Sequence, residues 1–236
     1  MNKAPILIAA VILGSFAVGG VGLVAMTHEL TDARIAENQR QAMLAKLKAI
    51  VPAERMVNDP LADRIEVSDP DLLGAIQTEV FRVRGDDGPV AVILQPVVPD
   101  GYAGPIRLLV SVLRDGSLGG VRVLEHHETP GLGDKIDEKK DDWIVEQFSG
   151  KSLADPVPEK WQVKRDGGVF DQFTGATITP RSIVKAVKNT LLFVEREGDA
   201  LYVPSQQPVP DAAPQAPAEA APAQAHRAPA ANGETG

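Results

Sequence analysis

The sequence predicts an α+β domain with a mainly antiparallel sheet and flanking helices, preceded by one N-terminal transmembrane helix. Apolar, β-branched runs follow one another between residues 80 and 125 and are separated by turns that contain Gly and Asp, which is typical of an antiparallel meander. Apolar residues recur with helical spacing after Pro180. The first uncharged stretch is long enough to span a bilayer.

Length and composition limit both the size of the domain and its chemistry. Of the 236 residues, an apolar N-terminus and a Pro/Ala-rich C-terminus leave roughly 150 for one domain. The absence of cysteine excludes disulfides, thiolate metal sites, iron–sulfur clusters and cysteine nucleophiles. A net charge of −8 argues against nucleic acid as the main partner.

The stretch Ala4–Met26 carries no charge over 23 residues. As a helix it would measure about 34 Å, enough to cross the hydrocarbon core. A cleaved signal peptide is the competing interpretation, but its apolar part is about 7–15 residues long and ends in a small-x-small site. Because the stretch is longer and Leu23–Thr27 matches such a site poorly, we expect residues 1–28 to form a retained anchor.

The charges that flank the anchor predict its orientation. Lys3 and the amino group precede it, whereas Glu29 and Asp32 follow it. The positive-inside rule then places the N-terminus in the cytoplasm and the body outside, which in a Gram-negative bacterium is the periplasm. Residues 29–52 keep a helical spacing of apolar residues until Pro52 and are expected to form a stalk helix. An ordinary first helix of the domain is a compatible alternative.

The globular part is expected at residues 53–200. Residues 64–88 are ambiguous apart from a short strand at 80–84. Beyond them the patterns predict strands at 90–98, 106–113 and 118–125, a helix at 135–148, one or two strands within 157–170, and a helix from 180 to about 198. From Pro204 onward, 18 of 33 residues are Ala or Pro, so residues 201–236 are expected to be a disordered tail with polyproline character.

The strongest candidate for a functional site is the nine-residue stretch Asp171–Thr179, which is followed by Pro180. Thr179-Pro180 is typical of a helix start, with a hydroxyl at the N-cap and proline at the first helical position. Thr177 would then lie just before a helix N-terminus, where unpaired N–H groups and the helix dipole favour an anion. The small residues around it and a second glycine-containing loop at Glu128 would suit a phosphorylated ligand.

Other kinds of site are not supported. His126-His127-Glu128 invites a metal interpretation, but adjacent side chains of a strand point to opposite faces and no third ligand is evident. Gly131-Leu132-Gly133 lacks the third glycine of a dinucleotide fingerprint. The sequence also contains no Gly-x-Ser-x-Gly elbow of a hydrolase. We therefore expect neither a metal site nor a catalytic residue.

Three segments resemble the signatures of one FMN-binding family. Asp171-x-x-Thr174-Gly175-Ala176-Thr177-x-Thr179 resembles the site at which a flavin transferase esterifies FMN, through its phosphate, to a threonine. Glu128-Thr129-Pro130-Gly131-Leu132-Gly133 resembles a second signature, and the segment from Gly101-Tyr102 to Ile106 a third. Together with one anchor, this order resembles the G subunit of the Rnf (Rsx) ion-translocating electron-transport complex over roughly residues 1–200.

The resemblance implies a role for each segment. Thr177 would carry covalent FMN, attached from FAD by the flavin transferase, which needs Asp171, Gly175 and Ala176 for recognition. The Glu128–Gly133 loop and the Gly101-Tyr102 loop would line the flavin. Arg181 and Lys185 could support its phosphate, and the alternative is that both are ordinary surface residues. The chain would transfer electrons within an inner-membrane complex, with the other membrane subunits as partners and no complete turnover of its own.

Two alternatives stay open. The chain could instead be the C subunit of the related sodium-pumping NADH:quinone reductase, or part of another flavin-based reductase. In a different class, it could be an anchored envelope adaptor whose Ala/Pro-rich tail is the working part.

Overall fold

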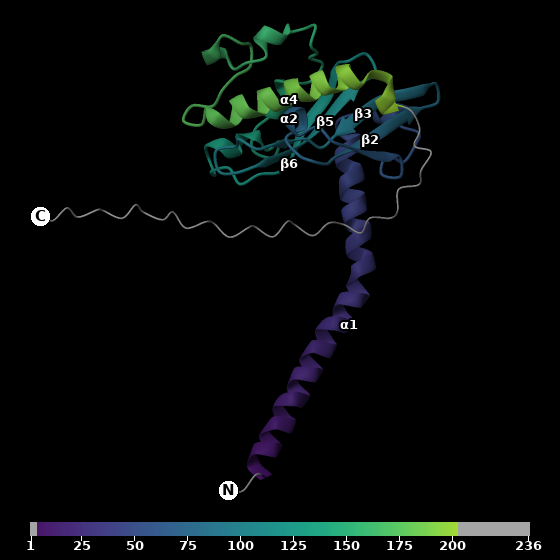
Figure 1. Ribbon diagram of the computed structural model, residues 1–236, viewed down its shortest axis with the longest axis vertical. Coiled ribbons are helices and arrows are strands. Elements are labelled where there is room, and N and C mark those ends of the chain that lie inside the picture. The colour runs from purple at the N-terminus through teal and green to yellow at the C-terminus, as the bar shows by residue number, and fades with distance from the viewer. Residues whose placement is uncertain (1–3, 203–236) are drawn as a thin grey trace, which may run out of the picture.

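A six-stranded antiparallel sheet is the centre of this computed structural model, which describes residues 4–202 (Figure 1). Its strands are β1 (Arg64–Val67), β2 (Thr78–Gly85), β3 (Gly88–Leu94), β4 (Val97–Val98), β5 (Ile106–Leu113) and β6 (Leu118–Glu125). The order is β1-β2-β3-β5, with β4 pairing the start of β5 on the β3 side and β6 pairing its other edge. The predicted α+β class and its antiparallel meander are confirmed.

The strands expected at residues 106–113 and 118–125 are confirmed as β5 and β6. The strand expected at residues 90–98 is confirmed as β3 as far as Leu94, but it does not continue unbroken, because β4 covers Val97 and Val98 alone. Pro96 lies in the break and has no N–H to donate to a ladder. Its carbonyl still accepts the Leu108 N–H at 3.0 Å, which keeps both pieces against β5.

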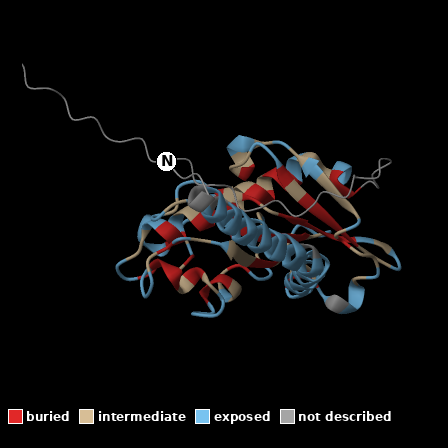
Figure 2. Cartoon of the chain, turned by 90° about the horizontal axis from the view of Figure 1, so that it is seen from below, coloured by how far each residue is buried: buried red, intermediate tan, exposed pale blue. Residues whose placement is uncertain are grey.

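The helix α1 (Ala4–Lys48) runs without a break through both the predicted anchor and the predicted stalk (Figure 1). Its 45 residues correspond to about 67 Å. It is long and apolar enough to cross a membrane, and its side chains are almost entirely exposed until the last turns. Those last turns meet the sheet (Figure 1), and Figure 2 shows the rest of the helix as exposed.

The end of α1 and the residues after it bury three side chains, those of Leu47, Ile50 and Val51, against one face of the sheet. They pack with residues that include Phe81 and Ile93. The close approach depends on two glycines of β6. A Cβ at Gly119 would lie 2.6 Å from the Ile50 carbonyl oxygen, and one at Gly120 would lie 3.2 Å from the Ile50 Cβ. Larger residues at these positions would push the stalk off the sheet.

The opposite face of the sheet is covered by α4 (Ile178–Glu197) (Figure 1). Leu108, Val110 and Val112 of β5 belong to the core beneath this helix, whereas Leu109 belongs to the core beside α1. Successive side chains of a strand point to opposite faces, so both faces of β5 are apolar and buried. The short helix α2 (Pro70–Leu73) lies against α4, and Asp69 caps it through the Leu72 N–H at 2.9 Å.

The helix expected at residues 135–148 is wrong. The structure has a 3₁₀ turn, η2 (Gly133–Ile136), and one short helix, α3 (Trp143–Glu146). Asp137 accepts the Lys139 N–H and Asp141 accepts the Trp143 N–H, both at 3.0 Å. Such local side-chain bonds to the backbone compete with a continuous helix.

The strands expected within residues 157–170 are also wrong. This region has the 3₁₀ turns η3 (Pro158–Lys160) and η4 (Lys164–Asp166) and a single bridge between Val163 and Phe170. The aromatic residues of this region fill the core. Trp161 and Phe170 lie 4.9 Å apart between ring centroids, and Phe170 lies 5.2 Å from Phe148.

The last described element is the 3₁₀ helix η5 (Gly198–Tyr202), which buries Leu201 and Tyr202, two residues beyond the expected end of the domain. A further 3₁₀ turn, η1 (Ala53–Arg55), follows the stalk. The Ala/Pro-rich tail expected at residues 201–236 lies, from 203 onward, outside the described residues.

Candidate functional site

The three loops singled out from the sequence meet at one cavity of about 250 Å³ beside the N-terminus of α4. The lining residues are Tyr102, Glu128, Thr129, Leu132, Gly133, Gly175, Ala176, Thr177, Ile178 and Thr179. Nine of these were singled out from the sequence. Ile178 was not, although it lies inside the motif, because the pattern leaves that position unspecified.

Glu128 forms hydrogen bonds to two other segments that surround the cavity. Its side chain is buried, with 5% of the residue exposed. Oε2 accepts the Thr179 hydroxyl of α4 at 2.6 Å, and Oε1 accepts the Ala103 N–H of the loop between β4 and β5 at 3.2 Å. A carboxylate that accepts bonds from two other segments fixes their positions relative to its own loop.

Two glycines make room for this carboxylate. A Cβ at Gly133 would lie 2.5 Å from Oε2 of Glu128, and a Cβ at Gly101 would lie 3.1 Å from Oε1 and 2.1 Å from the Gly104 carbonyl oxygen. Gly101 is therefore a packing residue behind the cavity rather than part of its lining. Glycine is needed at positions 101 and 133 because the backbone there lies close to the Glu128 carboxylate.

The turn between Glu128 and η2 has its own requirements. Gly131 has a φ of +78°, which disfavours other residues, and its N–H donates to Oδ1 of Asp134 at 2.7 Å. Asp134 is buried and was missed as a supporting residue. An acidic residue directly after a glycine turn was the available signal. Pro130 and Gly131 are exposed and lie outside the lining.

The expected N-cap at Thr179 is wrong. The helix begins one residue earlier, at Ile178, with Thr177 at the N-cap position. Thr179 lies in the first turn with its hydroxyl bonded to Glu128, so it cannot cap the helix. Within the described residues the Thr177 side chain makes no capping hydrogen bond. Thr177 is half-buried and lies at the helix N-terminus, on the wall of the cavity.

Asp171 and Thr174 lie outside the cavity lining. Asp171 anchors the start of the motif: its Oδ1 contacts Lys164 Nζ at 2.5 Å, and its N–H donates to Gln147 Oε1 at 2.8 Å. Its carbonyl accepts the indole N–H of Trp143 at 3.0 Å. Thr174 is exposed. The structure thus gives Asp171 a supporting role in the fold of the motif.

The two cations considered for the phosphate are placed elsewhere. Arg181 binds Asp166 through two hydrogen bonds of 2.6 and 2.9 Å, which hold the pKa of that carboxyl below its usual value. Lys185 lines a small groove beside α2 and β4. Among the described residues that line the cavity, none is Arg or Lys.

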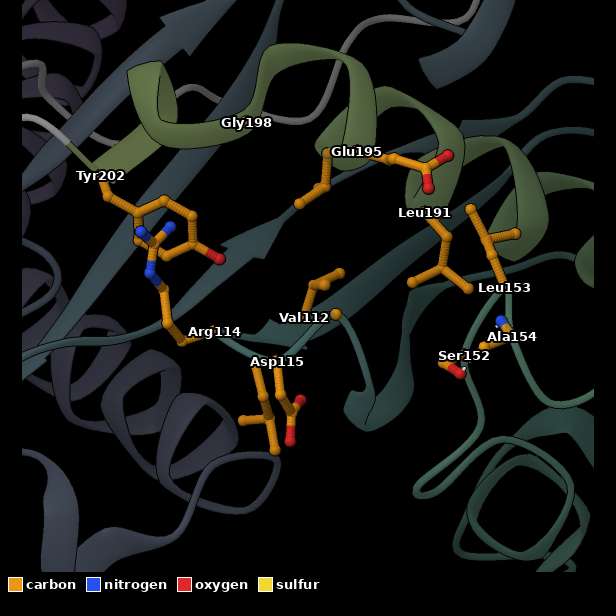
Figure 3. Close-up of a pocket in the computed structure, with 13 residues that line it drawn as sticks. Val112, Arg114, Asp115, Ser152, Leu153, Ala154, Leu191, Glu195, Gly198 and Tyr202 are labelled. Atoms are coloured by element: carbon orange, nitrogen blue, oxygen red, sulfur yellow. Dashed lines mark hydrogen bonds between the residues drawn. The ribbon is translucent and has the colours of Figure 1, made fainter.

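A larger cavity of about 340 Å³ lies at the other end of α4 (Figure 3). Its lining includes Leu191 and Glu195 of α4, and Arg114 lies 4.5 Å from the centroid of the Tyr202 ring. Burial raises the pKa of the Tyr202 phenol. None of the residues singled out from the sequence lines this cavity, so we assign the candidate site to the smaller one.

A methyl group at position 133 tests the geometry around Glu128. We expect Gly133→Ala to lower the free energy of unfolding by about 1–3 kcal/mol, because its Cβ would overlap Oε2. Urea unfolding of the full chain in detergent, followed by tryptophan fluorescence, measures the change. In a Glu128→Ala background the same substitution should cost less, since Oε2 is gone and only the Cβ of residue 128, at 3.0 Å, and the Thr179 hydroxyl oxygen, at 3.2 Å, remain close to the new methyl group. Additive effects of the two substitutions would contradict this packing.

Two protein families match the parts of the chain that contain the three loops and α1. Residues 101–192 match the model of the FMN-binding domain family, and residues 1–50 match that of the RnfG N-terminal region. Three relatives, each named as the G subunit of an ion-translocating oxidoreductase complex, match most of the chain. The Pseudomonas aeruginosa protein is 47% identical over 200 residues, covering 84% of this chain and 92% of its own length.

The Escherichia coli protein is 45% identical over 183 residues, covering 78% of this chain and 88% of its own length. The Vibrio atlanticus protein is 40% identical over 193 residues, covering 80% of this chain and 90% of its own length. The two matched models cover the three loops and the helix α1, and together with these relatives they confirm the resemblance found in the sequence. The chain belongs to the family of G subunits of ion-translocating oxidoreductase complexes.

Proposed function

We propose that this protein carries electrons within a membrane-bound ion-translocating oxidoreductase complex, through an FMN esterified to Thr177. One observation carries the proposal: the three loops that resemble FMN-binding signatures line one cavity, and Thr177 lies on its wall at the start of α4. The family and its FMN-binding domain support the redox role. The bound flavin supplies the electron chemistry, and the protein supplies its position and surroundings.

The chemistry of the lining fits FMN. Leu132, Ile178 and Tyr102 offer apolar and aromatic surface for a flat ring, and each is more than a third exposed, at 43, 45 and 66%. Gly175 and Ala176 leave the neighbourhood of Thr177 open. The phosphodiester would keep a negative charge, which the N-terminus of the 20-residue helix α4 favours.

Attachment requires a partner enzyme rather than a catalytic residue of this chain. In the proposed step Oγ1 of Thr177 forms a bond to the FMN phosphorus of FAD, the pyrophosphate bond breaks, and AMP leaves. The flavin transferase supplies the metal and accepts the hydroxyl proton. Asp171 supports this step by anchoring the first residue of the motif to Gln147 and Lys164. A covalent bond also prevents loss of the flavin by dissociation.

The proposed location is the inner membrane, crossed once by α1. The apolar part of α1 would span the bilayer with Lys3 on the cytoplasmic side, and the domain would lie in the periplasm. The end of α1 packs firmly on the sheet, so the stalk would hold the domain at a set height above the bilayer. The other membrane subunits of the complex would be its partners in electron transfer.

Co-expression with and without a flavin transferase tests the proposal. We expect the full chain to retain flavin fluorescence on a denaturing gel when the transferase is present, and to lose it when the transferase is absent. Denaturation releases a flavin held by non-covalent contacts alone. A protein band without flavin fluorescence after co-expression would contradict the proposed attachment.

A further inference from the structure

The helix α4 covers one face of the sheet, yet its N-terminus has no side-chain cap. Thr177, at the N-cap position, has helical backbone angles (φ −90°, ψ −22°), and its side chain makes no capping hydrogen bond. The first turn contains no acidic residue that would interact favourably with the helix dipole. In the short helix α2, by contrast, Asp69 accepts the Leu72 N–H at 2.9 Å. Of these two helices, only α2 has its first turn satisfied by a side chain.

One of the free donors in the first turn of α4 is shielded from water. Pro180 has no N–H, so the donors without an intrahelical acceptor include those of Ile178 and Thr179. Neither N–H donates a hydrogen bond within the described residues. Ile178 is 45% exposed, so water can reach it, but Thr179 is fully buried. A buried N–H group without an acceptor lowers the stability of the fold.

None of the side chains around this turn supplies the missing acceptor. Oε2 of Glu128 accepts the Thr179 hydroxyl at 2.6 Å, and Oε1 accepts the Ala103 N–H. Glu128 therefore binds the side chain of the first turn and not its backbone. A capping hydroxyl usually belongs to a residue with extended backbone angles, which Thr177 does not have. The turn needs an acceptor that extends further than a threonine hydroxyl.

We propose that covalent FMN supplies this acceptor, so that the flavin-carrying chain is more stable than the unmodified chain. This inference rests on the proposed function, which attaches the phosphate to Oγ1 of Thr177. The free phosphate oxygens lie beyond Oγ1, and they carry a negative charge that a helix N-terminus favours. Attachment then completes the first turn of α4 and also provides the redox group. The unmodified subunit is the less stable form.

Hydrogen–deuterium exchange of the full chain in detergent tests the proposal. The protein is prepared with and without the flavin transferase, and its intact mass verifies which form is measured. We expect attachment to slow exchange of the Ile178 and Thr179 amides by about 5–30-fold, the effect of a typical cap. The thermal unfolding midpoint should rise by about 2–8 °C. Thr177→Val should give the same exchange and the same midpoint with and without the transferase.

Thr177→Asp separates the cap from the flavin ring. Its carboxylate offers an acceptor and a negative charge at the same position, but it has no hydroxyl to which the transferase could attach flavin. We expect this variant, without flavin, to exchange the same amides more slowly than Thr177→Val does. It should also recover part of the rise in the unfolding midpoint.

The outcomes distinguish this proposal from the proposed function. A flavin-carrying wild type whose Thr179 amide exchanges as fast as in the unmodified chain would overturn the capping role and leave the proposed function standing. Slower exchange in that protein, without any slowing in Thr177→Asp, would assign the effect to the flavin ring and would also overturn the capping role. A chain whose mass shows no added flavin after co-expression would overturn both proposals.

Discussion

Thr177→Val is expected to abolish covalent flavin, with no fluorescent band on a denaturing gel after co-expression with the flavin transferase. Valine has nearly the shape of threonine but lacks the oxygen that would bond to phosphorus. The fold should survive, because the Thr177 hydroxyl makes no capping hydrogen bond in the described structure. Flavin fluorescence on the gel, with equal protein loading, measures the effect.

Thr174→Val is the matched control. It removes the same oxygen three residues earlier in the same motif, at an exposed position outside the cavity lining. We expect this variant to retain most of its flavin. Fluorescence that persists in Thr177→Val would contradict the assignment of Thr177 as the attachment residue.

Glu128→Ala is expected to destabilise the domain by about 2–4 kcal/mol. The substitution removes the acceptor of two hydrogen bonds and leaves the fully buried Thr179 hydroxyl without a partner. Because the bonds join three segments, the cavity walls should loosen together, and covalent flavin should fall as well. Tryptophan fluorescence during urea unfolding of the full chain reports the domain alone, since Trp143 and Trp161 both lie in its core.

Glu128→Gln separates charge from hydrogen bonding. Its side-chain oxygen can accept from Ala103 and its amide can donate to Thr179, but the Thr179 hydroxyl then loses the acceptor of its own proton. We therefore expect a loss of about 1–3 kcal/mol, smaller than that of the alanine variant. If the alanine and glutamine variants were equally unstable, the negative charge rather than the hydrogen bonds would hold the loops. Equal stability of all three proteins would contradict a bridging role for Glu128.

Short motifs in the sequence pointed to three loops that the structure brings to one cavity, whereas several elements around these loops were predicted wrongly. Short motifs identified the loops at Glu128 and Thr177 because their glycines and hydroxyl groups have few alternative uses. The meander was predicted because β5 and β6 are apolar runs of strand length that end in turns. The loop motifs and the apolar runs of β5 and β6 both depend on neighbouring residues in the sequence, so they can be recognised without knowledge of long-range contacts.

The failures arose where long-range packing or local side-chain bonds overrode a pattern. The helix expected at residues 135–148 is interrupted by Asp137 and Asp141, whose carboxylates bind nearby N–H groups. The strands expected within residues 157–170 did not form, and Trp161 and Phe170 of this region pack in the core. Thr179 was taken as an N-cap since its true partner, Glu128, is 51 residues away in the sequence.

The role of Asp171 could not be predicted for the same reason. Its contacts come from Gln147, Lys164 and Trp143, which lie in segments whose secondary structure the sequence misrepresented. The resemblance implies that the transferase recognises Asp171. The structure adds that Asp171 also supports the fold of the motif. Comparing Gln147→Ala with Asp171→Ala would show whether loss of the anchor alone lowers flavin attachment.

The intact mass of the co-expressed protein tests the central claim most directly. We expect the full chain to be heavier than the unmodified protein by one FMN less one water, and we expect peptide mapping to place the added mass on Thr177. The Thr174→Val variant should show the same shift, and Thr177→Val should show none. An unmodified mass in the presence of an active transferase, or an added mass mapped to another residue, would contradict the account.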